Sequence, residues 1–364
     1  MRCFVSGFGP FRWASAFALL SFTLPAVMAA PAAPAGATES GPRGIVVNAV
    51  SDMVYAITSS KDTVTAINGA TGKAETIKVG NGPKAVAVNP RTNRAYVINE
   101  FSGTMSVIDG MKVIATVDVG PLPSSIALNP VTNKIYVARS YGNGFMTVVD
   151  GATNQPSKIK VDVEANAIGV DTATDKIYLV GYEEHSVTVL DGATNTVSKV
   201  PAGTHLWEIA VDPASNTVYL PNSGDQRMDV IHGTGNTTVP VGNFPCAVAL
   251  NPATRRAYVL NYASDNVTVV DMNSNRVVAT IPVGRRPQSI VVNPKTDRIY
   301  VANTHSRSVT VIDGKNNSVV ATVAAGDGPF SIAVNPVTNK IYVANRLSNK
   351  VTVIDGATNQ STEI

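Results

Sequence analysis

Four histidines are the residues of this sequence best suited to bind a metal or to move protons. His185 and His205 fall in neighbouring stretches of the chain, and His305 occupies a similar stretch further on. None of the familiar two-histidine spacings of zinc sites is present. We therefore expect no metal, haem or other cofactor, and keep His185, His205 and His305 as weak candidates for a metal or haem ligand set. His232 stands where other parts of the chain have a turn aspartate, so we expect a structural role for it.

Residues for acid–base or nucleophilic catalysis are sparse. The sequence has no Gly-rich phosphate loop, no nucleophile elbow and no zinc motif. A hydrolase or lyase with a channel metal needs several carboxylate and amide side chains that converge, and the best set here is Asn166 with Glu164 and Glu208. We predict no catalytic residues and favour a protein that is not an enzyme, with a channel-site hydrolase or lyase as the alternative.

A string related to "SIAVNPVTNKIYVAN" recurs eight times along the chain. Its tyrosines follow one another at a period near 41 residues: Tyr55, Tyr96, Tyr136, Tyr178, Tyr219, Tyr258, Tyr300 and Tyr342. Each repeat contains four short runs rich in Val, Ile, Thr and Tyr, separated by turn residues, as in residues 288–294, 297–303, 308–313 and 318–326. This period predicts an all-β propeller of four-stranded antiparallel blades.

The repeated polar residues have the types that turns require. Asn-Pro-x-Thr-Asn joins the first two strands, and an aspartate follows the third strand at Asp109, Asp150, Asp191, Asp271, Asp313 and Asp355. Large and small apolar residues alternate within the strands, which predicts that neighbouring blades cover both faces of each sheet. The repeated residues are therefore expected to build a frame rather than a site.

Function is expected where the repeat keeps its length but changes its chemistry. One such position stands at the start of the innermost strand of each blade and faces the mouth of the central channel. This mouth column comprises Arg43, Lys84, Ser124, Asn166, Trp207, Cys246, Gln288 and Phe330. A proline precedes it in six units, at Pro42, Pro83, Pro123, Pro245, Pro287 and Pro329. A rigid proline would hold each variable side chain in a fixed place.

The loops between the second and third strands should open on the same face and form a rim. They carry aromatic and charged residues, including Phe101, Tyr141, Tyr182, Glu183, Glu184 and Arg307. Such residues on a rim are typical of a recognition surface, although ordinary solvated loops would have a similar composition. The predicted binding residues are Arg43, Lys84, Asn166, Trp207, Gln288, Phe330, Phe101, Tyr182 and Arg307. The alternative for Trp207 and Phe330 is that they only plug the channel.

The repeat resembles a known family. "YVIN", "YVAN" twice, "VTVIDG" twice and "VATIPVG" are similar to the YVTN-type repeat of YncE-like and surface-layer-associated propellers, and the resemblance covers residues 41–364. It implies an exported propeller with a binding or scaffold role, often of seven blades, with lactonases, an antibiotic lyase and haem-carrying domains in related superfamilies. Since seven blades would leave one complete unit unburied, we expect eight blades here, with seven as the alternative. We expect blade one to close against blade eight by packing.

The first 29 residues are typical of a secretory signal peptide. They contain Arg2 and Arg12, no acidic residue, an apolar run too short and too interrupted to span a membrane, and small residues at Val27 and Ala29. Residues 30–40 read as a flexible lead-in, and residues 41–364 as one propeller domain. Removal of the leader lowers the formal charge from +3 to about +1, which gives no strong signal for nucleic acid. We expect an exported protein, periplasmic, cell-surface or secreted, without a transmembrane segment after processing, whose partner is a protein or an envelope or carbohydrate ligand.

Overall fold

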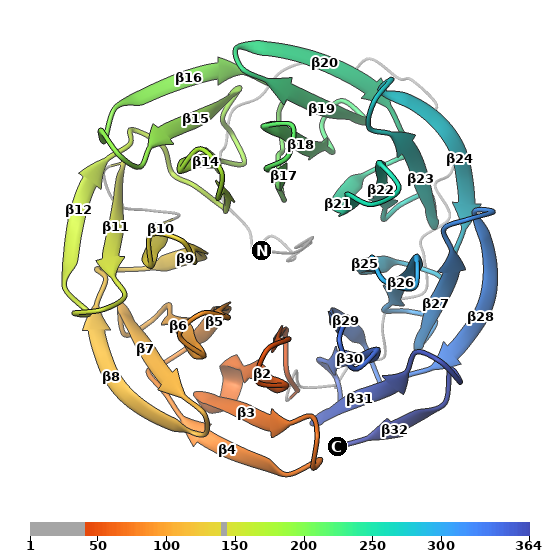
Figure 1. Ribbon diagram of the computed structural model, residues 1–364, viewed down its shortest axis with the longest axis horizontal. Helices are drawn as coiled ribbons and strands as arrows, with labels where there is room; N and C mark the ends of the chain where they lie inside the picture. The colour runs from red at the N-terminus through yellow and green to blue at the C-terminus, as the bar shows by residue number, and fades with distance from the viewer. Residues whose placement is uncertain (1–40, 140–143) are drawn as a thin grey trace, which may run out of the picture. The chain divides into compact units, whose positions relative to one another are not determined.

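The computed structural model describes residues 41–139 and 144–364, which form eight four-stranded antiparallel sheets. Each sheet takes four strands that are consecutive in the sequence, and the sheets follow one another around a central axis (Figure 1). The first strand of each blade lies nearest the axis and the fourth lies outermost. The structure confirms an all-β propeller and settles the number of blades at eight.

The strands of blades 1 to 4 have the following bounds. Blade 1 comprises β1 (Gly44–Asn48), β2 (Met53–Thr58), β3 (Thr63–Asn68) and β4 (Ala74–Lys78), with the short 3-10 helix η1 (Ser59–Lys61) between β2 and β3. Blade 2 comprises β5 (Pro83–Asn89), β6 (Arg94–Asn99), β7 (Thr104–Asp109) and β8 (Lys112–Asp118). Blade 3 comprises β9 (Pro123–Asn129), β10 (Lys134–Arg139), β11 (Phe145–Asp150) and β12 (Pro156–Lys160). Blade 4 comprises β13 (Ala167–Asp171), β14 (Lys176–Val180), β15 (Ser186–Asp191) and β16 (Val197–Pro201).

Blades 5 to 8 repeat this order. Blade 5 comprises β17 (Ala210–Asp212), β18 (Thr217–Asn222), β19 (Arg227–His232) and β20 (Gly235–Pro240). Blade 6 comprises β21 (Pro245–Asn251), β22 (Arg256–Asn261), β23 (Asn266–Asp271) and β24 (Arg276–Pro282). Blade 7 comprises β25 (Pro287–Asn293), β26 (Arg298–Asn303), β27 (Ser308–Asp313) and β28 (Ser318–Ala324). Blade 8 comprises β29 (Pro329–Asn335), β30 (Lys340–Asn345), β31 (Lys350–Asp355) and β32 (Ser361–Glu363).

The core lies between neighbouring blades. In blade 7, Tyr300 is fully buried and packs in one cluster with Ile332 and Ile341 of blade 8. The other repeat tyrosines are buried in the same way, so each blade completes the core of the next. Burial of apolar area at about 25 cal/mol per Å² makes these eight interfaces the main source of stability. The repeated tyrosine is thus a packing residue.

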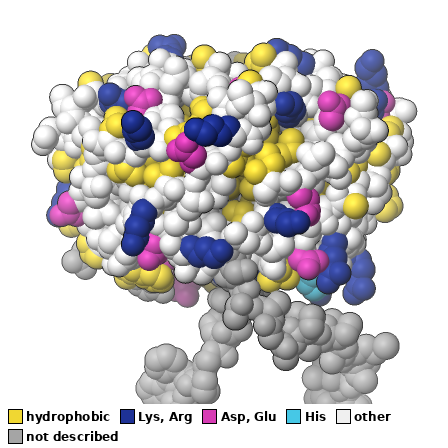
Figure 2. All heavy atoms as spheres, turned by 90° about the horizontal axis from the view of Figure 1, so that it is seen from below, with side chains coloured by type: hydrophobic (Ala, Val, Ile, Leu, Met, Phe, Trp, Pro, Cys, Tyr) yellow, Lys and Arg dark blue, Asp and Glu magenta, His cyan; other side chains and the backbone are white. Residues whose placement is uncertain are grey.

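The expectation that both faces of every strand are covered is wrong for the outermost strands. In β28, Val319 and Val320 remain 43% and 45% exposed, and Val277 and Val278 of β24 are similar. The outermost strand has no further blade to cover its outer side. Figure 2 accordingly shows hydrophobic side chains on the outside of the ring, interspersed with Lys, Arg, Asp and Glu.

The repeated aspartate is a turn residue, as predicted. Asp150 accepts hydrogen bonds from the backbone N–H groups of Ala152 and Thr153 at 2.9 and 2.8 Å. In blade 6 the equivalent bond from Ser274 is the largest factor that lowers the pKa of Asp271, to about 2. The carboxylate therefore closes the hairpin.

Neighbouring blades are also joined by a ring of side-chain links, which we did not predict from the sequence. The Asn that opens Asn-Pro-x-Thr-Asn donates to the side chain that ends the same motif in the next blade, as in Asn293 Nδ2 to Asn339 Oδ1 at 2.7 Å. The described residues show such a link at seven of the eight blade junctions: Asn48–Asn93, Asn89–Asn133, Asn129–Asp175, Asp212–Arg255, Asn251–Asp297, Asn293–Asn339 and Asn335–Asp52. The motif therefore turns the chain and fastens one blade to the next.

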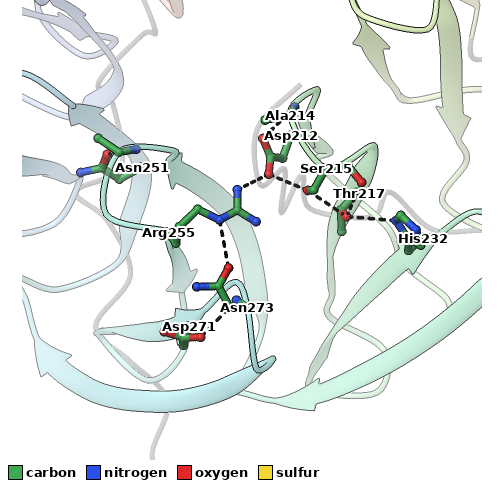
Figure 3. Close-up of polar contacts among 10 residues, drawn as sticks. Asp212, Ala214, Ser215, Thr217, His232, Asn251, Arg255, Asp271 and Asn273 are labelled. Carbon is green, nitrogen blue, oxygen red and sulfur yellow. Dashed lines mark hydrogen bonds and ion pairs between the residues drawn. The ribbon is translucent and has the colours of Figure 1, made fainter.

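The link between blades 5 and 6 has a different chemistry (Figure 3). Arg255 replaces the usual Asn or Asp, and its Nη1 donates to Oδ2 of Asp212, whose side chain is 1% exposed. Ser215 Oγ also donates to this carboxylate at 2.6 Å, and Ser215 contacts Thr217, whose hydroxyl lies 3.4 Å from Nδ1 of His232. His232 is exposed at the end of β19 and lies at the edge of this network, so its structural role stays a prediction.

Blade 8 closes directly against blade 1. Asn335 Nδ2 donates to Asp52 Oδ1 at 2.6 Å, and Lys340 Nζ donates to the carbonyl of Gly69 at 2.6 Å. Gly41 N donates to the carbonyl of Arg346 at 3.0 Å, and a Cβ on Gly41 would lie 1.7 Å from the carbonyl oxygen of Ser348. Every described strand of blades 1 and 8 pairs within its own blade. The ring therefore closes by packing and side-chain links, without strand exchange.

Candidate binding site at the mouth and rim

The mouth column and the described rim loops of blades 2, 5, 6, 7 and 8 lie on one face of the ring. In blades 2, 5, 6, 7 and 8 the rim loop donates a backbone hydrogen bond to the segment that precedes the innermost strand of its own blade, as in Glu100 N to the carbonyl of Gly82 at 2.8 Å. The same pairing joins Tyr262 to Phe244 and Arg346 to Gly328. In these five blades the bonds fix the rim loop relative to the start of the innermost strand. The predicted common face is therefore present.

Half of the residues of the mouth column are buried and half are partly exposed. The buried members are Ser124, Cys246, Gln288 and Phe330, whereas Arg43, Lys84, Asn166 and Trp207 are half-buried. Buried members contribute to the packing around the axis and have little surface to offer a ligand. The half-buried members keep the exposure that direct binding needs.

An aromatic platform lies at the junction of blades 4 and 5. It consists of Tyr182 from a rim loop and of His205 and Trp207 from the segment before β17. The rings of Tyr182 and His205 are stacked with centroids 4.4 Å apart, and the rings of Tyr182 and Trp207 are tilted with centroids 4.8 Å apart. Tyr182 is 37% exposed and the other two are half-buried. The three rings present a partly exposed apolar surface with polar edges.

Hydrogen bonds hold this aromatic platform in place. Trp207 Nε1 donates to Ser223 Oγ at 2.9 Å, and Ser223 Oγ donates to the carbonyl of His205 at 3.1 Å. His205 N donates to the carbonyl of Tyr182 at 3.0 Å, which joins blade 5 to blade 4. The tryptophan N–H is thereby satisfied, and its ring plane is fixed before any ligand arrives.

The platform lies where the repeat is least regular. Blades 4 and 5 are the two units without a proline before the mouth column, and β17 has three residues where β25 has seven. Asp229 of β19 holds the segment that precedes β17. Asp229 is fully buried, and the third strands of the other blades have Ser or Thr at this position. Asp229 accepts from Gly203 N at 3.1 Å and from Asn222 Nδ2 at 3.0 Å, and pairs with Arg227. The missing proline and the unusual Asp229 were both visible in the sequence, and either could have directed attention to blade 5.

Arginine side chains gather on the other side of the mouth, on blades 7, 8 and 1. Arg286 Cζ lies 4.8 Å from the centroid of the Tyr262 ring, and Arg346 Cζ lies 5.0 Å from that of Phe330. Phe330 itself is 4% exposed, so this predicted contact residue is covered and supports the arginine above it. Burial and the neighbouring Arg346 lower the pKa of Arg43. The charges of Arg43 and Arg346 therefore interact across the junction of blades 8 and 1.

The remaining predicted residues are separate from these two clusters. Lys84 forms an ion pair with Glu100, and Arg307 pairs with Asp327 at 2.8 Å on the exposed rim. Phe101 is 75% exposed and lies over Gly82, where a Cβ would come within 2.5 Å of its ring. These residues line the same face without converging on one point.

The weak metal candidates do not converge either. His185 is exposed, His205 is stacked on Tyr182, and His305 lies on blade 7. Within residues 41–139 and 144–364, no group of three or more His, Cys, Asp or Glu side chains could hold a metal ion. Asn166 and Glu208 are half-buried on blades 4 and 5, and Glu164 is exposed. The described side chains thus offer no ready-made metal site.

Some predictions fall outside the described residues. The signal peptide, the lead-in of residues 30–40 and Tyr141 lie there, so they stay predictions. In the part of the chain that the structure covers, no helix has the length and apolar character needed to cross a membrane.

No family model matches this chain, and no curated protein matches it, so the resemblance to YVTN-type propellers stays a prediction. Solved structures do match it. Hydrazine synthase of Kuenenia stuttgartiensis is 21% identical with a TM-score of 0.60, over 91% of this chain and 99% of that chain. Dihydro-heme d1 dehydrogenase NirN, solved in complex with DHE, is 12% identical with a TM-score of 0.71, over 87% of this chain and 74% of that chain.

A third match is apo AztD from Citrobacter koseri, which is 17% identical with a TM-score of 0.64, over 84% of this chain and 92% of that chain. The first two of these proteins are named for different activities, a synthase and a dehydrogenase. At such low identities the likeness concerns architecture, not chemistry. This chain is therefore similar to known propeller proteins in its fold.

Proposed function

We propose that this chain is an exported, non-enzymatic binding protein that recognises its partner with the mouth and rim of the propeller. The observation that carries the proposal is the aromatic platform of Tyr182, His205 and Trp207, which is partly exposed and held by hydrogen bonds. Fixed aromatic side chains lose little entropy on binding and frequently dominate binding energy. A protein or an envelope carbohydrate that offers an apolar or ring surface fits this chemistry.

Capture from an envelope fraction tests this proposal. The intact exported protein is immobilised beside Trp207→Ala and beside Val337→Ala, which alters an apolar residue that is 63% exposed in the turn between β29 and β30. We expect the wild type and Val337→Ala to retain the same component, and Trp207→Ala to lose it, with an affinity lower by about 2 kcal/mol. Equal retention by all three proteins would contradict a role for the platform.

Export has its own test. The charge-poor apolar leader with Val27 and Ala29 supports cleavage, so N-terminal sequencing of the exported protein should begin near Ala30. Recovery of Met1 in a soluble cytoplasmic form would contradict export without affecting the binding proposal.

A channel-site hydrolase or lyase remains the second candidate. Two of the structural neighbours are named as a synthase and a dehydrogenase, and Asn166 and Glu208 are half-buried near the mouth. A screen of lactones and esters with added divalent metals addresses it. Turnover that disappears in both Asn166→Ala and Glu208→Gln would favour the enzyme over the binding protein.

A further inference from the structure

The stretches of blades 4 and 5 that surround the aromatic platform are acidic. Two of them run from the end of an outermost strand to the mouth column, and two are rim loops: residues 161–166, 202–207, 181–185 and 223–226. Together they contain five carboxylates and no Lys or Arg: Asp162, Glu164, Glu183, Glu184 and Asp225. The corresponding stretches of blade 7, residues 283–288 and 304–307, contain three arginines and no carboxylate. The platform therefore lies in the acidic part of the mouth.

In blade 4 the acidic residues lie directly beside Tyr182. Glu183 follows Tyr182 in the chain, and consecutive Cα atoms are about 3.8 Å apart. A Cβ on Gly181, which precedes Tyr182, would lie 2.6 Å from the carbonyl oxygen of Glu164. The same Cβ would lie 2.8 Å from Cγ of Glu184. The backbone of Glu164 and the side chain of Glu184 therefore contact the loop that carries Tyr182.

In blade 5 a further carboxylate lies against the segment that precedes β17. A Cβ on Gly203 would lie 2.8 Å from Oδ2 of Asp225. A Cβ on Gly224, the residue before Asp225, would lie 3.0 Å from Nδ1 of His205. His205 N in turn donates to the carbonyl of Tyr182 at 3.0 Å. Carboxylates of two blades thus border one group of rings.

Basic residues offset only part of this negative charge. Three of the carboxylates have an ion-pair partner: Glu184 with Lys199 at 3.7 Å, Asp225 with Arg227 at 3.3 Å, and Asp162 with Lys160 at 3.3 Å. Glu164 and Glu183 are exposed, and no ion pair among the described residues includes either of them. Exposed charges act over about 8 Å at physiological ionic strength. These two charges therefore favour a positive ligand at the platform.

The rings suit a cation better than an anion. Tyr182 and Trp207 meet at 58° with centroids 4.8 Å apart, so their faces point in two directions. The face of a Trp or Tyr ring attracts an ammonium or guanidinium group that lies within about 6 Å of its centroid, and several rings together form the cages that bind quaternary ammonium groups. Trp207 Nε1 already donates to Ser223 Oγ at 2.9 Å. The indole therefore has no N–H left for an anion.

We propose that the platform and its carboxylates form a cation subsite, which receives a substituted ammonium or guanidinium group of the ligand. The rings would contact the apolar shell of such a group, and Glu164 and Glu183 would balance its charge. The inference rests on the proposed binding function and narrows its ligand to one that presents an organic cation. A small amine and a basic side chain of a protein partner both offer this chemistry, and the test separates them.

Titration of the purified exported protein with organic cations tests the subsite. Trp207 is the only tryptophan of residues 30–364, so its fluorescence reports on the platform, and calorimetry detects binding that leaves the fluorescence unchanged. Choline represents a small amine, and Nα-acetyl-lysine amide and Nα-acetyl-arginine amide represent basic side chains of a protein. The control probe is the dimethylbutanol isostere of choline, in which carbon replaces nitrogen and the charge is lost.

Two sets of variants separate the charges from the rings. Glu164→Gln/Glu183→Gln removes two charges and keeps the rings. Its matched control is Glu75→Gln/Glu363→Gln, which removes two charges from exposed residues of the outermost strands β4 and β32. Tyr182→Leu removes a ring but keeps apolar volume, and Tyr182→Phe keeps the ring. Melting curves show whether each variant is folded.

We expect the wild type to bind at least one cation about tenfold more tightly than the neutral isostere, and more weakly as salt is raised. Glu164→Gln/Glu183→Gln should bind that cation about threefold to tenfold more weakly, and the matched control should change less than about twofold. Tyr182→Phe should bind it more tightly than Tyr182→Leu. Tighter binding of choline would indicate a small amine, and tighter binding of either amide would indicate a basic segment of a protein. Failure of all three cations to bind, equal binding of the isostere, or equal loss in the matched control would overturn the subsite.

The envelope capture that depends on Trp207 is measured separately. Capture that is unchanged in Glu164→Gln/Glu183→Gln, and that neither choline nor the amides displace, would retain the binding function and reject the subsite. Binding of a cation without capture from the envelope fraction would retain the subsite and reject the proposed class of partner.

Discussion

Trp207 and Phe330 occupy equivalent positions in their blades but have different environments. Phe330 is 4% exposed beneath Arg346, whereas Trp207 is half-buried and donates to Ser223. The burial of Phe330 therefore favours a packing role over direct contact with a ligand. For Trp207 it leaves surface available for a partner.

Alanine substitution at these two positions should separate stability from binding. Phe330→Ala removes a buried ring and leaves a cavity, so we expect the free energy of unfolding to fall by about 3 kcal/mol. Trp207→Ala removes a half-exposed ring and one hydrogen bond, so we expect a loss of about 1 kcal/mol. Denaturant titration measures both values. A larger loss for Trp207→Ala than for Phe330→Ala would show that the platform is mainly structural.

His305 should report the positive potential of Arg286, Arg285 and Arg346 through the pH dependence of stability. Burial and the arginines lower its pKa below the ordinary value of 6.5 in the folded protein. Between the lowered pKa and 6.5 the unfolded chain binds more protons, so stability falls as the pH is lowered through this window and is retained above it. The Cε1–H resonance of His305 should titrate below pH 6.5, and should move upward in Arg286→Gln. Titration at or above 6.5 in the wild type would contradict the positive potential.

At the scale of the strands and turns, the links between blades explain why polar residues recur. Each link satisfies a buried amide or carboxylate with a partner from the next blade, as Asn293 does with Asn339. An unsatisfied buried polar group would cost about 1–3 kcal/mol. The repeated Asn and Asp residues therefore have a structural role. Functional residues are expected at positions where one blade differs from the repeat.

The link of Asp212 with Arg255 offers a test of this account (Figure 3). In Arg255→Ala the carboxylate of Asp212 stays buried and loses its cationic partner, so we expect the free energy of unfolding to fall by about 2 kcal/mol. The double variant Asp212→Asn/Arg255→Asn recreates the pair that other junctions use, as in Asn89 with Asn133. Thermal melts should show that the double variant regains most of the loss. A double variant no more stable than Arg255→Ala would mean that the link does not depend on complementary side chains.

The strands were predictable because their signals are local. The segments read from the sequence for blade 7 agree with β25 to β28 within about two residues, since Asn-Pro and Asp-Gly mark the turns between apolar runs. The links between blades were not predicted, because they join residues about 45 positions apart that a single repeat does not show together. The platform was found only as separate residues. Its geometry depends on the irregular path before β17, which no local pattern specifies.

At the scale of the whole ring, the junction between blades 8 and 1 is special because the residues that it joins lie at opposite ends of the chain. Most junctions join residues about 45 positions apart, but Asn335 and Asp52 are 283 positions apart. Contacts between consecutive blades can form as the repeats fold onto one another, as in other repeat proteins. The closing contacts must also overcome the entropy of joining the two ends of the array, which grows with the length of chain enclosed.

This difference predicts that the closing junction forms late in folding. Asn335→Ala and Asn129→Ala are matched variants, because each removes a 2.6 Å bond from a fully buried asparagine to an aspartate of the next blade. We expect both to lower the free energy of unfolding by similar amounts, about 1–3 kcal/mol. Because the transition state would lack the closing contacts, Asn335→Ala should accelerate unfolding and leave the folding rate nearly unchanged, whereas Asn129→Ala should also slow folding. Stopped-flow folding and unfolding in denaturant distinguish the two, and an equal effect of both variants on the folding rate would show that the ring closes before the rate-limiting step.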